Sequence, residues 1–83
     1  MTIEQLVPLT NGLSLTACNE TLMLDGARIT PLPDSSVEMA FRIAGTDLVP
    51  RFRLSRRHLA SSSLEDMTSI VRHVASRAFG CAE

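Results

Sequence analysis

The residues best suited to bind another molecule lie between positions 51 and 58. The segment RFRLSRRH holds four arginines and a histidine within eight residues, and three serines follow at 61–63. Arginine keeps its charge and donates hydrogen bonds in a planar fork that matches carboxylates and phosphates. An acidic protein surface, nucleic acid and plain solvent are therefore the three environments to weigh for this segment.

Catalytic chemistry is not indicated. Serines and two histidines are present, but no GxSxG turn places a serine for nucleophilic attack, and the four glycines are too dispersed to cradle a phosphate. His58 and His73 lie fifteen residues apart, and Cys18 and Cys81 lie near opposite ends of the chain. Since a metal site needs three or four ligands at workable spacing, we expect no metal, no cofactor and no enzymatic activity.

Length and composition indicate a single domain over residues 1–83. Apolar residues make up 45% and charged residues 20% of the chain, which is ordinary for a globular protein. The net charge of −1 is unevenly distributed, with −4 over residues 1–50 and +3 over residues 51–83. This asymmetry favours an anionic partner for the second half of the chain, or contact between copies.

The sequence favours a cytoplasmic protein. MTIEQLVPL lacks the basic and apolar regions of a secretory signal, and no apolar stretch approaches the ~20 residues that span a bilayer, so we expect no membrane association. Two cysteines do not make a disulfide framework, and in a reducing compartment both are expected to be thiols.

Alternating apolar and polar residues predict the strands. GLSLTACN alternates, TLMLDGARIT predicts a hairpin whose type I′ turn is Asp25-Gly26, and PLPDSS predicts a loop. VEMAFRIA is the most regular strand, and a short connection leads to LVPRFRLS, where Leu48, Phe52 and Leu54 are expected to point inward. Pro50 has no N–H group, so this last strand is expected at a sheet edge.

Capping residues predict the helices. Ser63 and Asp66 approach a capping box, an apolar stripe runs from residue 64 to 78, and Gly80 is suited to end the helix. Thr2 and Gln5 form a second capping box for a short helix that Pro8 would stop. A helix-turn-helix over residues 54–74 is the alternative, but Leu64 and His73 stand where that motif needs a small and an apolar residue.

These elements predict an α+β fold, in which one C-terminal helix covers one face of an antiparallel sheet of four to five strands, with a possible short N-terminal helix. The arginines alternate with the apolar positions and are therefore expected on the other face or just beyond it. The candidate partner-binding residues are Arg42, Arg51, Arg53, Arg56, Arg57 and His58.

The function predicted from this pattern is a small non-enzymatic protein-interaction module, an inhibitor or adaptor that occludes a partner protein. In general profile the chain resembles small bacterial or phage proteins of that kind, anti-CRISPR proteins among them, a resemblance that gives no residue a role. The alternative is a nucleic-acid-binding protein that uses the Arg51–His58 segment.

A homodimer joined through the uncovered sheet face or an edge strand is also expected, because one helix does not cover all the apolar side chains of the sequence. The residues left over are Leu6, Val7, Leu9, Met23, Leu32 and Val49.

Overall fold

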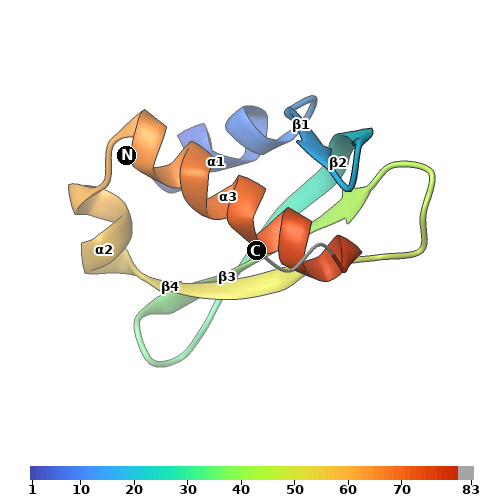
Figure 1. Ribbon diagram of the computed structural model, residues 1–83. Coiled ribbons are helices and arrows are strands. Elements are labelled where there is room, and N and C mark those ends of the chain that lie inside the picture. Colours follow the sequence, from blue (N-terminus) through green and yellow to red (C-terminus); the bar gives the residue numbers. More distant parts are fainter. Residues whose placement is uncertain (81–83) are drawn as a thin grey trace.

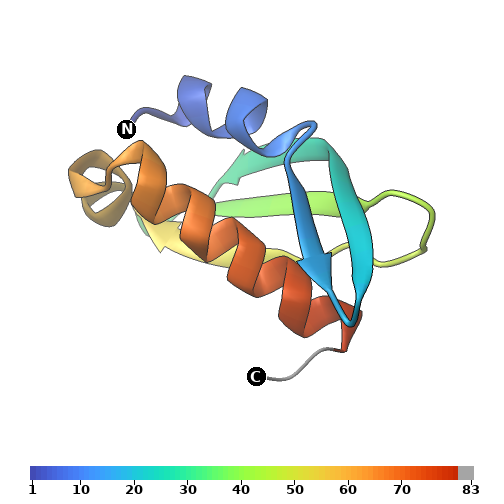
Figure 2. The same ribbon diagram turned by 45° about the horizontal axis from the view of Figure 1, so that its top comes forward.

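The computed structural model describes residues 1–80, which form one four-stranded antiparallel sheet and three helices. The elements in chain order are α1 (Ile3–Thr10), β1 (Ser14–Ala17), β2 (Glu20–Pro31), β3 (Ser36–Ile43), β4 (Arg51–Ser55), α2 (Arg56–Ser61) and α3 (Leu64–Phe79). The strand order is β1-β2-β3-β4, and α1 and α3 lie on the same side of the curled sheet (Figures 1 and 2). The predicted α+β class is confirmed. No helix within residues 1–80 is long and apolar enough to cross a membrane.

Capping residues set the ends of the two longer helices as predicted. The Thr2 N–H donates to Gln5 Oε1 at 2.9 Å, and Ser63 and Asp66 exchange backbone-to-side-chain hydrogen bonds of 3.1 and 3.2 Å. Gly80 ends α3 in the left-handed conformation, with φ at 96°. Pro8, however, does not stop α1, which continues to Thr10. Its missing N–H costs the helix one hydrogen bond, and burial of the Leu6 side chain in the core holds the helix in place.

The hairpin prediction at Asp25-Gly26 is wrong, because β2 runs straight through these residues. The two-residue turn lies earlier, at Cys18 and Asn19, where φ is 52° and 63°, and it pairs Ala17 with Glu20. Gly26 also has a positive φ, 63°, but it forms a β-bulge in which β2 gains one residue relative to β3. Both sites need residues that adopt a positive φ. The local sequence therefore does not distinguish a turn from a bulge.

Cys18 is disulfide-bonded. The expectation of a thiol at this position is therefore wrong, and the same expectation for Cys81 lies outside the described residues. Since disulfides persist mainly in oxidising compartments, the thiol argument for a cytoplasmic location no longer applies.

The connection before β4 is longer than predicted. The strand begins at Arg51, and residues 44–50 form a loop. Two backbone bonds still tie this loop to β3, from the Phe41 N–H to the Pro50 carbonyl and from the Ile43 N–H to the Leu48 carbonyl, both at 3.2 Å. Leu48 is 37% exposed rather than buried, contrary to the prediction, whereas the edge position of β4 agrees with it.

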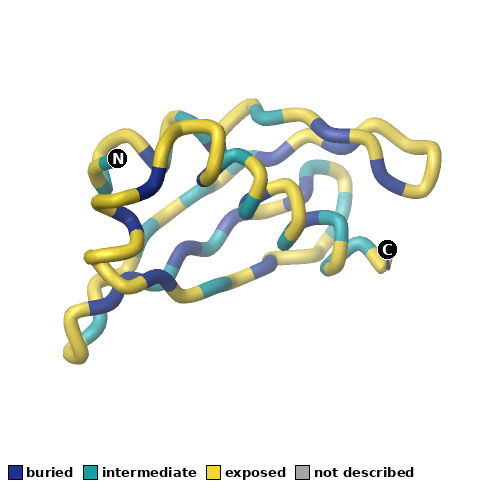
Figure 3. Tube along the Cα trace, turned by 60° about the vertical axis from the view of Figure 1, so that its left-hand side comes forward, coloured by how far each residue is buried: buried dark blue, intermediate teal, exposed yellow. Residues whose placement is uncertain are grey.

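The core lies between the sheet and the helices α1 and α3. Buried and exposed positions alternate along the strands (Figure 3), and the buried apolar side chains of β3 are the four that the alternation predicted, Val37, Met39, Phe41 and Ile43. Helix α3 contributes Met67, Val71 and Ala75, all fully buried. Leu64 does not join them, because it stands in the first turn of α3 and is 62% exposed.

The six-residue helix α2 was not part of the leading prediction, although the helix-turn-helix alternative implied a helix in this segment. It begins directly after β4, where the Ser55 side chain accepts a hydrogen bond from the His58 N–H. Its Leu59 side chain is buried in the core. Residues 56–79 thus form two helices, but the long apolar stripe from residue 64 onward forms one continuous helix, as expected.

Candidate functional site: the uncovered face of the sheet

The face of the sheet opposite α1 and α3 carries most of the strand arginines. Strand register places outward-pointing residues in rows across β2, β3 and β4. One row is Arg28–Ala40–Arg51, and the next is Thr30–Glu38–Arg53. A third row pairs Asp25 with Arg42. We call this surface the outer face, and its residues at these positions are polar or small, as a solvent-facing sheet requires.

A hollow opens in the outer face at Ala40. This alanine has the smallest side chain of the middle row and stands between two arginines, so the surface is recessed between them. The hollow has a volume of about 500 Å³. Its lining residues are Gly26, Arg28, Thr30, Glu38, Ala40, Phe41, Arg42, Val49 and Arg51. We call it the arginine hollow. Three cations from three strands surround one carboxylate, which gives the rim a charge of +3 − 1 = +2.

The arginines of the hollow differ in their internal partners. Arg42 binds the Asp25 carboxylate in a bidentate manner, with Nε–Oδ1 and Nη2–Oδ2 distances of 2.9 and 3.1 Å. These bonds lower the pKa of Asp25 and raise that of Arg42. Arg51 lies 3.9 Å from Glu38, and its side chain is 66% exposed. Arg28 has no ion pair within residues 1–80. Because exposed ion pairs contribute only ~0–1 kcal/mol, Arg28 and Arg51 can bind an external anion at little cost.

The structure separates the six candidate residues predicted from the sequence. Arg42 and Arg51 line the arginine hollow, and Arg53 lies on the same face in the adjacent row. The other three belong to α2 and are exposed. Arg56 lines a depression shared with Met1–Glu4 of the N-terminus. His58 lines another with residues of α3. The predicted cluster is therefore two groups, one on the sheet and one on α2.

Arg28 was not among the predicted candidates. The hairpin prediction placed it beside Met23, whereas in the structure it pairs with Ala40 of β3. A bulge shifts by one residue which side chains face outward, and here it brings Arg28 onto the outer face. The sequence signal that could have identified it is the continued apolar alternation on both sides of Asp25-Gly26, which indicates one long strand.

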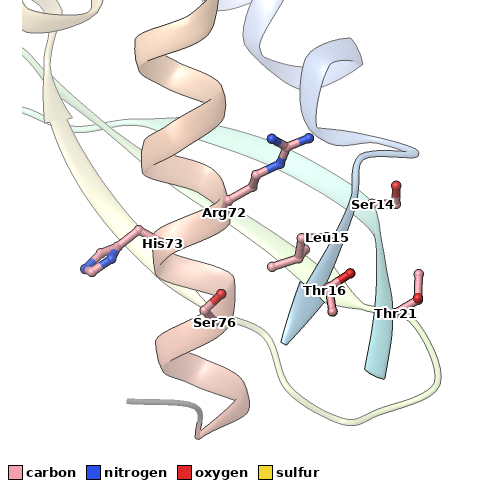
Figure 4. A pocket seen from close by; sticks show the side chains of 7 residues that line it. All are labelled: Ser14, Leu15, Thr16, Thr21, Arg72, His73 and Ser76. Carbon is pink, nitrogen blue, oxygen red and sulfur yellow. The ribbon is translucent and has the colours of Figure 1, made fainter. Parts of the chain in front are cut away.

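A second cavity of about 480 Å³ lies between α3 and β1 (Figure 4). Arg72, His73 and Ser76 come from α3, and Leu15 and Thr16 come from β1, with Ser14 and Thr21 beside them. The His73 ring is turned away from β1, and Arg72 is the one cation directed to that side (Figure 4). This cavity therefore offers one cation, compared with three at the arginine hollow.

No group of three or more His, Cys, Asp or Glu side chains in residues 1–80 is arranged to hold a metal ion. Comparison with protein families, with curated proteins and with solved structures gives no match. The function must therefore be argued from the outer face itself.

Proposed function

We propose that this protein is a small non-enzymatic binding module whose outer face contacts an acidic surface of a partner protein. The observation that supports the proposal is the row Arg28–Ala40–Arg51, because it presents two weakly engaged guanidinium groups on either side of a recess. A carboxylate that enters the recess can accept hydrogen bonds from both sides, and charged donors make such bonds stronger than neutral ones. Binding of this kind suits an inhibitor or adaptor that occludes its partner.

Protein is favoured over nucleic acid because the outer face has mixed charge. Glu38 and Asp25 stand in the same rows as the arginines, and they would repel a continuous phosphate backbone. Ala40 and Val49 add apolar surface to the recess, which suits a folded partner better than a phosphodiester chain.

The test is affinity capture from a native host, with the wild-type protein compared against Ala40→Leu and Arg51→Glu. Ala40→Leu fills the recess without changing any charge, and Arg51→Glu reverses one rim charge. The matched control is Arg77→Glu, which makes the same charge change on α3, away from the outer face. We expect a partner with an acidic surface that is lost in the first two variants and kept by the control.

Two outcomes would overturn the proposal. Equal capture by Ala40→Leu would show that the partner does not use the recess. Alternatively, generic DNA or RNA could bind with a steep salt dependence that the same variants remove. That result would assign the outer face to nucleic acid.

A further inference from the structure

The outer edge of β4 presents unpaired backbone groups. The Phe41 N–H donates to the Pro50 carbonyl, and the Arg56 N–H donates to the Ser35 carbonyl, which fixes the alternation of the β3–β4 ladder. In an antiparallel pair every second residue directs its N–H and C=O toward the neighbour. Phe52 and Leu54 therefore bond to β3, and the backbone groups of Arg51 and Arg53 point away from the sheet. Within residues 1–80 no other segment bonds to them.

The two edges of the sheet differ in access. At the other edge, α3 runs alongside β1 (Figures 2 and 4), and side chains of both elements line the cavity between them. Within residues 1–80, no strand pairs with the outer edge of β4, and its side chains at 51, 53 and 55 are exposed. An extended segment can therefore be added at β4 without moving any element.

A second copy of this chain is a poor occupant for that edge. If β4 paired with β4 of another copy around a two-fold axis, the registers that use Arg51 and Arg53 would place arginine opposite arginine. Like charges directly across a strand pair are destabilising. Carboxylates at the same positions are stabilising, because each would face an arginine that has no close ion pair or only the 3.9 Å contact of Arg51 with Glu38.

We infer that β4 accepts an extended segment of the partner protein as a fifth antiparallel strand, with carboxylates at alternate positions opposite Arg51 and Arg53. This inference rests on the proposed function and makes it specific. Backbone hydrogen bonds would supply a general contribution to binding, and the arginines would select acidic segments. The added strand would extend the rows of the outer face, so that its carboxylate opposite Arg51 lies beside the arginine hollow.

The probe is a capped heptapeptide that alternates threonine with glutamate, used with the full-length protein. Binding is measured by titration, and amide hydrogen exchange is followed by NMR. In the unbound protein the amides of Phe52 and Leu54 should be protected, and those of Arg51 and Arg53 should exchange fast. With the peptide bound, the Arg51 and Arg53 amides should become protected as well.

Two control peptides isolate the backbone and the charge. N-methylation at the residues whose N–H groups face β4 should weaken binding roughly tenfold or more, because those hydrogen bonds cannot form. Replacement of glutamate by arginine should abolish binding. If the N-methylated peptide binds as well as the parent, and shifts occur only around Ala40, strand addition is wrong and the proposed function stands.

Absence of binding by the parent peptide at millimolar concentration also overturns strand addition. The capture experiment above then decides the proposed function independently, because it uses intact partners and variants of the recess.

Discussion

Asp25 and Arg42 form the best-defined ion pair of the outer face, and its contribution to stability should depend on pH. The hydrogen bonds from Arg42 lower the pKa of Asp25 in the folded state below the ordinary value of an aspartate carboxyl group. A carboxyl group whose pKa is lower in the folded state stabilises the fold at any pH above its pKa in the unfolded state. This contribution is lost as the pH falls through the pKa of the group in the folded state. Asp25→Asn should therefore be less stable than wild type at pH 6, with a difference that closes below about pH 4. Urea midpoints across this range provide the measurement. Asp47→Asn, in the exposed loop, serves as control, and an unchanging gap for Asp25→Asn would contradict the assignment.

Gly26 is the second residue whose individual role can be tested, because its φ of 63° is strained for side chains branched at Cβ. Space is not the obstacle, since a Cβ placed there would meet only Arg42 Cβ, at 4.0 Å. Gly26→Val should cost roughly 1–3 kcal/mol through backbone strain alone. Gly26→Asn should cost less, since asparagine tolerates this conformation. Thermal melting of both variants checks the order, and equal losses would point to a cause other than φ.

At the scale of elements, the sequence predicts the helices and strands that nearby residues determine. It does not predict the features that depend on contacts between residues far apart in the chain. The alternation in β3 and the caps of α3 are local, and both predictions are confirmed. The bulge at Gly26 depends on partners far along the chain: Asn11 Oδ1 accepts the Ala27 N–H at 3.0 Å, and Arg42 holds Asp25. Helix α2 has only six residues, too few for a periodic signal. The candidate site shows the same division, since Arg42, Arg51 and Arg53 followed from alternation, whereas Arg28 required the register across the bulge.

The packing of α3 gives the prediction for this scale. Val71 is fully buried against the sheet, and Ser69 on the same helix is exposed. Val71→Asp places a carboxylate without a partner in the core and should cost roughly 4 kcal/mol or more, close to the whole stability of a small domain. Ser69→Asp should change the urea midpoint little. Similar losses in both variants would contradict the observed orientation of α3.

At the scale of the whole molecule, fewer exposed apolar side chains support the predicted homodimer than the sequence suggested. Of the apolar side chains left over in the sequence, Leu6 is fully buried and Leu9 packs against the core, because α1 covers part of the sheet together with α3. Val7 and Leu32 are half-buried, and only Met23 and Val49 of this set are exposed, at 48% and 50%. Since pairing of two β4 strands through Arg51 and Arg53 is disfavoured, the predicted dimer would use the outer face, where it would compete with the proposed acidic partner.

A dimer through the outer face should therefore depend on these two exposed side chains. Sedimentation at micromolar concentration should give twice the chain mass of 9.0 kDa, that is 18.0 kDa. The double variant Met23→Glu, Val49→Glu should return to the mass of one chain, because it places two carboxylates in an apolar contact. Leu64→Glu changes an even more exposed apolar side chain, on α3, and should leave the dimer intact. A wild-type protein that sediments as a single chain would overturn the dimer. Met23 and Val49 would then be available to the same acidic partner that the arginines of the outer face are proposed to bind.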